Sequence, residues 1–148
     1  MEDKAYVKKL HGDAVLPTRE SMYAAGVDLH AYIEDKTELI IRPHETVKIG
    51  TGLAIQIPKN LFGAIFARSG MATKLGVAPA NKVGVCDSDY TGEYIVPLHN
   101  HGEEPVVIKH GDRIAQLVFL PYYALEFVEV KELEKTERGD GGFGSTGK

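Results

Sequence analysis

Two stretches of the chain combine arginine with small residues in a way that suits an anionic ligand. Residues 69–76 begin with Ser69, a possible N-cap, and end with a glycine, so we predict a short helix there. Arg68, Ser69 and the amide of Gly70 would lie at its N-terminus, where unpaired N–H groups and the helix dipole favour an anion. In the second stretch, the tail 138–148, glycines would let backbone N–H groups wrap a phosphate closely.

The tail also matches two nucleotide-binding motifs in form. Residues 142–147 read GFGSTG, a GxGxxG pattern, and Lys148 completes the GxxxxGK of a P-loop. A Rossmann turn or a P-loop must be followed by a helix that holds the phosphates, and no helix is expected here, so we discard both folds. Phe143 is unusual, because a lone aromatic in a polar tail has no core to join. A disordered tail is the alternative to a phosphate-binding arm.

The elements that must position these groups are predicted to be short strands. Apolar residues alternate with period two in segments 47–49, 53–57, 62–66, 94–98 and 114–120. Turn-forming residues separate these segments at the spacing of an antiparallel sandwich or barrel. We therefore predict an all-β fold with one short helix, in which residues 1–130 form the β domain and residues 131–148 form its flexible glycine-rich C-terminal arm.

Composition and charge argue against several classes of protein. The formal net charge of −4 is spread along the chain, and without a basic stripe we expect no binding to nucleic acid. The hydrophobic fraction is 43% and no long uncharged apolar run occurs, so nothing is expected to span a membrane. The charged N-terminus lacks the apolar centre of a secretory signal. These features predict an intracellular, cytoplasmic protein.

Three residue types could suggest other chemistry. Cys86 is the only cysteine, which excludes an intrachain disulfide and a thiolate zinc cluster, and its apolar neighbours favour a packed strand residue over a nucleophile. The six histidines do not have the spacing of a metal-ligand set. Gln116 lies on the apolar face of its strand, where an unpaired amide would be costly, so it needs a hydrogen bond to the protein or to a ligand.

Five blocks, in order along the chain, resemble the trimeric dUTP pyrophosphatases, or dUTPases. They are AGVDL at 25–29, RSGM at 68–71, NKVGVCDSDYTG at 81–92, GDRIAQL at 111–117 and RGDGGFGSTG at 138–147. The resemblance implies a jelly-roll-like β fold and a homotrimer with active sites at subunit interfaces. It also implies hydrolysis of dUTP to dUMP and pyrophosphate with Mg²⁺, under a C-terminal arm that closes over the nucleotide.

The third block carries the residues that the resemblance links to the nucleoside and to catalysis. Asp87 matches the general base that takes a proton from the water attacking the α-phosphorus in line. Tyr90 matches the residue whose ring lies under the deoxyribose, where a 2′-hydroxyl would clash. Asn81 and the backbone of the following residues, Val85 included, match the stretch that pairs with the uracil edge.

The remaining blocks are linked to the phosphates and the metal ion. Arg68, Ser69 and Gly70 match the phosphate-binding block, and Gln116 matches a residue that faces the phosphates. Asp28 resembles the carboxylate that holds Mg²⁺ through water, while the triphosphate supplies the other oxygens.

The arm is implied to act as a lid that excludes water and fixes the reactive geometry. Phe143 would stack on the uracil, and the hydroxyl and guanidinium groups of the arm would meet the γ-phosphate. The arm residues assigned to nucleotide binding are Arg138, Phe143, Gly144, Ser145 and Thr146.

Structural alternatives remain open for four of these residues. Asp87 could be a turn former, and Tyr90 could be a core tyrosine at the end of a strand. Gln116 could be purely structural, and Asp28 could pair with a nearby arginine. The third block, residues 81–92, departs from the family at Thr91, where Arg or Gln is common. This threonine removes a possible charge beside Asp87.

Two rival functions fit parts of the same pattern. The dCTP deaminases belong to the same superfamily but use a glutamate in place of this aspartate–tyrosine block. Some dUTPase-like proteins of mobile elements are nucleotide-gated binding partners of repressors. The sequence therefore leaves a protein regulator open.

Overall fold

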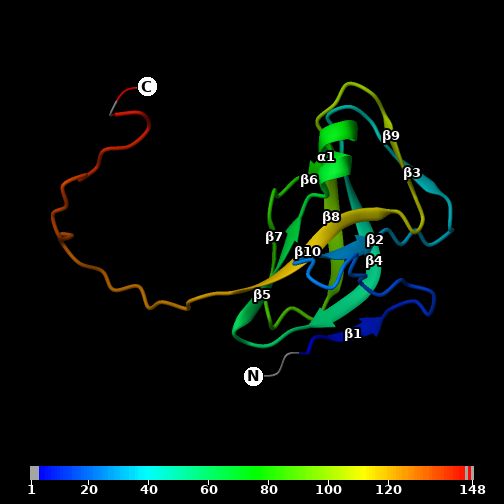
Figure 1. Cartoon of the computed structure of the whole chain (residues 1–148), viewed down its shortest axis with the longest axis horizontal. Coiled ribbons are helices and arrows are strands. Elements are labelled where there is room, and N and C mark those ends of the chain that lie inside the picture. The colour runs from blue at the N-terminus through cyan, green and yellow to red at the C-terminus, as the bar shows by residue number, and fades with distance from the viewer. Residues whose placement is uncertain (1–3, 146, 148) are drawn as a thin grey trace.

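The computed structural model describes residues 4–145 and 147, and this part of the chain consists of strands with one helix, α1 (Ser69–Leu75) (Figure 1). The prediction of an all-β fold with one short helix is confirmed. The strands are β1 (Tyr6–Lys9), β2 (Val27–His30), β3 (Glu38–Ile41), β4 (Thr46–Gln56), β5 (Leu61–Phe66), β6 (Val77–Pro79), β7 (Gly84–Cys86), β8 (Glu93–Asn100), β9 (Val106–Lys109) and β10 (Arg113–Pro121).

The strands pair into two four-stranded antiparallel sheets and one two-stranded sheet. One large sheet has the order β1-β4-β8-β6, the other has the order β2-β10-β5-β7, and β3 pairs with β9. Each sheet keeps two edge strands among the described residues, so the architecture is an open sandwich of the jelly-roll kind and not a closed barrel.

The core draws apolar side chains from both large sheets. On β8 the buried residues Tyr94, Val96 and Leu98 alternate with more exposed ones, as the period of two predicts. They belong to one cluster with side chains from β2, β4, β5 and β10, including Leu29, Ile49, Leu53, Ile55, Ile65, Ile114 and Leu117. The shared core fixes the two sheets against each other.

Helix α1 begins one residue earlier than its sequence suggested. Arg68 occupies the N-cap position with extended φ and ψ of −87° and 132°, and Ser69 is the first helical residue, so Ser69 as N-cap is wrong. The predicted stop at Gly76 is confirmed, because Gly76 has a φ of 68° and its N–H bonds to the Met71 carbonyl. A Cβ at Gly76 would lie 3.1 Å from the Gly102 nitrogen.

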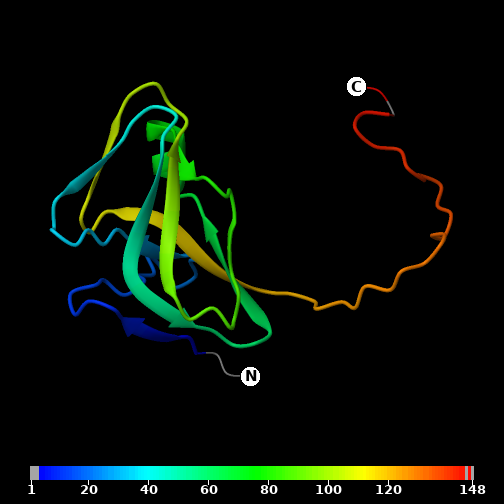
Figure 2. The ribbon, with the colours of Figure 1, turned by 180° about the vertical axis from the view of Figure 1, so that it is seen from behind.

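The C-terminal arm leaves the sandwich after β10. The last strand ends at Pro121, before residue 131, and no strand or helix occurs in residues 122–145. Both views show this segment extending away from the sheets (Figures 1 and 2). Several of its large apolar side chains are almost fully exposed, including Tyr123, Phe127, Leu133 and Phe143.

Among residues 4–145 and 147, no helix has the length and apolar character needed to cross a membrane.

Candidate functional site

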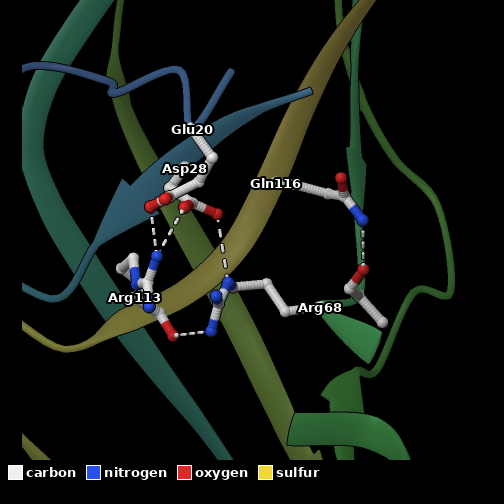
Figure 3. A network of polar contacts seen from close by, with 6 residues as sticks. Glu20, Asp28, Arg68, Arg113 and Gln116 are labelled. Atoms are coloured by element: carbon white, nitrogen blue, oxygen red, sulfur yellow. Dashed lines mark hydrogen bonds and ion pairs between the residues drawn. The ribbon is translucent and has the colours of Figure 1, made fainter. Parts of the chain in front are cut away.

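Four charged side chains meet where β2, β10 and the segment after β5 lie together (Figure 3). We call Glu20, Asp28, Arg68 and Arg113 the arginine network. Asp28 Oδ1 accepts a hydrogen bond from Arg68 Nε at 3.0 Å, and Asp28 Oδ2 lies 3.4 Å from a terminal nitrogen of Arg113. The same Arg113 nitrogen also pairs with Glu20. Asp28 therefore pairs with two arginines, as one of its structural alternatives proposed.

The network is centred on a buried carboxylate. The Asp28 side chain is only 9% exposed, whereas Arg68 and Arg113 are 27% and 42% exposed. A buried carboxylate is costly unless its oxygens are paired, and the two guanidinium groups satisfy both of them. A guanidinium carries five N–H donors, so Arg68 and Arg113 retain donors beyond those that Asp28 uses. Asp28 thus orients two cations that can still bind an anion.

Gln116 connects the network to the backbone beside it. Its Nε2 donates to the Ala67 carbonyl at 2.8 Å, directly before Arg68 (Figure 3). A Cβ at Gly26 would lie 2.5 Å from Gln116 Oε1, so any larger residue there would displace this amide. In the sheet, Gln116 pairs with Asp28 on one side and with Phe66 on the other. The half-buried amide therefore has the structural hydrogen bond that its position demands.

A cavity of about 410 Å³ opens between α1 and the start of β10. Three cations line it, Arg68, Lys74 and Arg113, together with the backbone of Gly70. The one carboxylate among its lining residues, Asp112, accepts a hydrogen bond from the Lys109 N–H at 2.8 Å. This excess of positive charge suits an anion such as a phosphate.

His30 lies on β2 close to the arginine network. Burial lowers the pKa of His30, against the opposing effect of the Asp28 carboxylate. Its Nδ1 is buried and has no hydrogen-bond partner among the described residues. The neutral imidazole is therefore the form that this position favours.

The residues of the third sequence block surround a second cavity, of about 230 Å³, beside β7. We call it the β7 cavity. Its lining residues are Ile65, Asn81, Gly84, Val85, Cys86, Asp87, Tyr90, Glu93, Tyr94 and Ile95. The four residues assigned from sequence to the nucleoside and to catalysis, Asn81, Val85, Asp87 and Tyr90, are therefore brought together.

Asp87 is exposed and lies directly after β7. Its backbone carbonyl accepts a hydrogen bond from the Tyr90 N–H at 3.1 Å, so the residue does begin a turn. Its carboxylate makes no hydrogen bond or ion pair with any residue in the described part of the chain, and it borders a third cavity as well as the β7 cavity. Lys59, Asp89 and Tyr122 line that third cavity, which has a volume of about 670 Å³. The carboxylate is thus accessible to water and to a ligand.

Tyr90 is not a core tyrosine, because it is 43% exposed. Its hydroxyl donates to the Glu93 carbonyl at 2.7 Å, which holds the ring along the wall of the β7 cavity. The core tyrosine of this region is Tyr94, which is 1% exposed. Tyr94 belongs to strand β8, whereas Tyr90 lies in the turn before it, so the two rings have different environments.

Cys86 packs behind the cavity as a small apolar residue, as expected. Its side chain is buried among strands β5, β7 and β8 beside the Tyr94 hydroxyl. Burial raises the pKa of the Cys86 thiol, so little thiolate forms at neutral pH. The geometry argues against a nucleophilic cysteine.

The arginine network and Asp87, at one edge of the β7 cavity, lie at opposite ends of β5. Gly63 pairs with Cys86, so Asp87 is level with Phe62, whereas Arg68 follows the other end of the strand. Six residues of strand at about 3.3 Å each separate these levels by roughly 20 Å. A nucleotide triphosphate chain is much shorter, so Asp87 and Arg68 of one chain cannot serve the same bound phosphates.

The arm lies away from both places (Figure 2). Arg138 Nε donates to the Gly141 carbonyl at 2.8 Å, and the Ser145 N–H bonds to the Gly142 carbonyl at 3.0 Å. Phe143 is fully exposed with a φ of 52°, and Gly144 has a φ of 82°. Thr146 lies outside the described residues. The structure therefore does not bring the arm residues to the other predicted site residues of the same chain.

No cluster of three or more His, Cys, Asp or Glu side chains that could hold a metal ion occurs in residues 4–145 and 147. Each oxygen of Asp28 accepts a charged N–H and keeps one lone pair, which can accept a hydrogen bond from a water on a bound ion. Mg²⁺ retains its waters readily and binds through few protein groups, so this donor set fits an ion that arrives with a triphosphate.

Sequence reasoning missed three residues of these sites. Arg113 stands in the fourth block, but its partnership with Asp28 depends on the pairing of β10 with β2. Glu20 belongs to a loop far from Arg113 in sequence, and it lies in no motif or predicted strand. Glu93 is the first residue of β8, and the alternation of buried and exposed residues along this strand predicts only that its side chain lies on the surface.

Comparison with known proteins places the chain among one family. The dUTPase family model matches residues 13–147. The deoxyuridine 5′-triphosphate nucleotidohydrolase of Desulfitobacterium hafniense (strain DSM 10664 / DCB-2) is 54% identical over 144 residues, covering 97% of this chain and 93% of the relative. The enzyme of the same name from Hydrogenobaculum sp. (strain Y04AAS1) is 46% identical over 144 residues, covering 97% and 98%.

A solved structure shares the fold over almost the whole length. The dUTPase of Staphylococcus bacteriophage 80alpha with dUpNHpp superimposes with a TM-score of 0.82 at 28% sequence identity. The alignment covers 98% of this chain and 99% of the phage protein. The similarity therefore extends from the sandwich into the arm.

Proposed function

This chain belongs to the dUTPase family, and on that premise we propose how its residues hydrolyse dUTP to dUMP and pyrophosphate. The observation that carries the proposal is the β7 cavity, where an exposed carboxylate, Asp87, lies beside an amide and a tyrosine ring suited to a nucleoside.

The active site is built between copies of the chain in a homotrimer. Asp87 and Arg68 lie at opposite ends of β5, so the β7 cavity of one subunit must be completed by the arginine network of another. The segment that runs from β10 into the arm supports assembly as well, because a long run of exposed apolar side chains in water needs a partner surface. These side chains are Tyr122, Tyr123, Leu125, Phe127, Val128, Val130 and Leu133.

The nucleoside half binds in the β7 cavity. Asn81 and the backbone near Val85 pair with the uracil edge, and a cytosine is rejected because its polar groups would leave these partners unpaired. The Tyr90 ring packs against the deoxyribose and leaves no room for a 2′-hydroxyl. Asp87 then takes a proton from a water aligned with the α-phosphorus, and in-line attack releases pyrophosphate.

The phosphate half binds at the arginine network of the neighbouring subunit. Arg68, with the N–H groups of Ser69 and Gly70, meets the phosphate oxygens, and Gln116 lies next to them. Mg²⁺ supplies charge neutralisation of the triphosphate when bound, and Asp28 reaches it through water. Two oriented guanidinium groups favour the negative charge that accumulates on the leaving pyrophosphate.

The arm, residues 131–148, closes the site. Phe143 stacks on the uracil, and Arg138, Ser145 and Thr146 contact the γ-phosphate, with Gly144 allowing a close backbone approach. Closure excludes water from the reacting groups and fixes the attacking geometry. The extended position of the arm away from its own sandwich supports delivery to a neighbouring subunit.

Pyrophosphate release tests the proposal directly. The purified chain is incubated with dUTP, dCTP, dTTP or UTP at equal concentrations, with and without Mg²⁺, and pyrophosphate is measured, with ammonia measured in the dCTP reaction. We expect pyrophosphate from dUTP alone, with Mg²⁺ required for the full rate. Ammonia from dCTP would indicate a deaminase instead, and the absence of pyrophosphate from every nucleotide would refute the hydrolase.

A further inference from the structure

Strand β4 carries a bulge opposite the first residues of β8. Gly50 pairs with Ile95 and Ala54 pairs with Glu93, so three residues of β4 face the single residue Tyr94. Gly52, inside the bulge, has a φ of 67°, which favours glycine. Bulges of this kind re-aim the side chains around them.

The Glu93 side chain holds this bulge in place. Its Oε1 accepts a hydrogen bond from the buried Gly52 N–H at 2.9 Å. The same oxygen lies over Gly50, where a Cβ would come within 2.4 Å of it. Thr51 adds a second link, because its hydroxyl donates to the Tyr94 carbonyl at 2.7 Å. A buried N–H without a partner is unfavourable, so the carboxylate fixes the bulge against β8.

The backbone of Glu93 holds Tyr90 at the same time. The Tyr90 hydroxyl donates to the Glu93 carbonyl at 2.7 Å. A Cβ at Gly92 would lie 2.7 Å from that hydroxyl, so the ring is seated directly over the Gly92 backbone. Tyr90 is 43% exposed, so few other groups restrain its ring; one of them is the buried Tyr94 ring, whose centroid lies 6.1 Å away. Among the described residues, the Glu93 carbonyl is the hydrogen-bond acceptor that holds the Tyr90 hydroxyl, so a shift of this carbonyl moves the ring in the β7 cavity.

We propose that Glu93 is a positioning residue for sugar discrimination: by locking the β4 bulge it fixes the carbonyl that seats the Tyr90 ring, and thereby sets the exclusion of a 2′-hydroxyl. The inference rests on the proposed function, since it concerns the deoxyribose of the same substrate. Exclusion by a clash depends on a wall that cannot move away. A wall displaced by a fraction of an ångström admits the ribonucleotide.

The test compares dUTP and UTP as substrates of full-length variants. Glu93→Ala removes the acceptor for the Gly52 N–H, and we expect the ratio of kcat/KM for dUTP over UTP to fall by about tenfold or more, mainly through faster turnover of UTP. Glu93→Gln keeps an acceptor oxygen and is expected to restore the ratio to about that of the unchanged chain. Tyr90→Phe loses the hydroxyl but keeps the ring, and the ratio should fall in the same way.

Two further comparisons separate this role from a structural one. In Tyr90→Phe, the added Glu93→Ala change should lower the ratio no further, because both changes release the same ring. Glu45→Ala is the matched control, since Glu45 Oε2 also accepts a backbone N–H, from Arg42 at 2.9 Å, in a turn outside the β7 cavity. Its selectivity should be unchanged.

Each result decides the inference. A folded Glu93→Ala chain with an unchanged ratio of kcat/KM for dUTP over UTP overturns the inference. A full loss of this selectivity in Glu93→Gln also overturns it, as do additive effects of Tyr90→Phe and Glu93→Ala in the double variant. If Glu93→Ala fails to fold, Tyr90→Phe decides alone, and unchanged selectivity there overturns the inference. Failure of the unchanged chain to release pyrophosphate from dUTP is a separate outcome, which refutes the proposed function itself.

Discussion

Replacing Asp28 by asparagine tests whether the arginine network stabilises the fold and prepares the phosphate site. Asparagine has nearly the same shape, but it lacks the charge that faces Arg68 and Arg113. The variant should be less stable and should also bind dUTP more weakly, because both guanidinium groups lose the partner that orients them.

The expected loss follows from exposure. The bond from Arg68 lies between groups that are 27% and 9% exposed, and a hydrogen bond to a charged group in such surroundings is worth roughly 2 kcal/mol. Arg113 is 42% exposed, so solvent screening reduces its share to about 0.5 kcal/mol. The amide oxygen of asparagine recovers about 0.5–1 kcal/mol as a neutral acceptor. The net destabilisation is about 1.5–2 kcal/mol, which lowers Tm by roughly 3–8 °C for a chain of this size.

Thermal unfolding at one fixed protein concentration measures this effect, because association of subunits also raises Tm. Steady-state hydrolysis of dUTP, measured in parallel, should show an increased KM. Asp13→Asn is the control, since Asp13 pairs with Lys36 on an exposed surface and its loss should leave Tm and KM unchanged. An Asp28→Asn chain with the Tm and KM of the unchanged chain would refute the role given to the network.

Three other substitutions address separate parts of the molecule. Asp87→Asn should bind a non-hydrolysable dUTP analogue almost normally yet lose most of kcat, and unchanged turnover would exclude Asp87 as the base. Phe143→Ala should reduce kcat/KM for dUTP by an amount on the order of 1–3 kcal/mol if the ring stacks on uracil, and no change would exclude stacking. Burial lowers the pKa of His30 below its ordinary value of 6.5, so the unfolded chain takes up a proton more readily and stability should fall as pH drops below 6.5. His30→Gln should show a shallower fall in denaturant unfolding between pH 7.5 and 5, and an identical slope would contradict this assignment.

The sequence by itself determined the class of fold and most elements. The apolar residues Tyr94, Val96 and Leu98, spaced two apart, predict a strand with one buried face, because side chains of a strand point to opposite sides in turn. Gly76 marked the end of α1 for a similarly local reason, since a left-handed residue is needed there. The five blocks also placed the chain in its family, and Asn81, Asp87 and Tyr90 do share one cavity.

The tertiary structure decided how the blocks relate to one another. Period two tells which face a residue occupies but not which strand lies beside it, so the contact of Asp28 with Arg68 and Arg113 required the order β2-β10-β5. The pairing of β5 with β7 put Asp87 and Arg68 at opposite ends of β5, which no spacing along the chain reveals. The β4 bulge that brings Glu93 to Gly52 likewise depends on how two strands pair. The register between strands is set by residues far apart in the sequence, whereas the alternation of side chains is set within one strand.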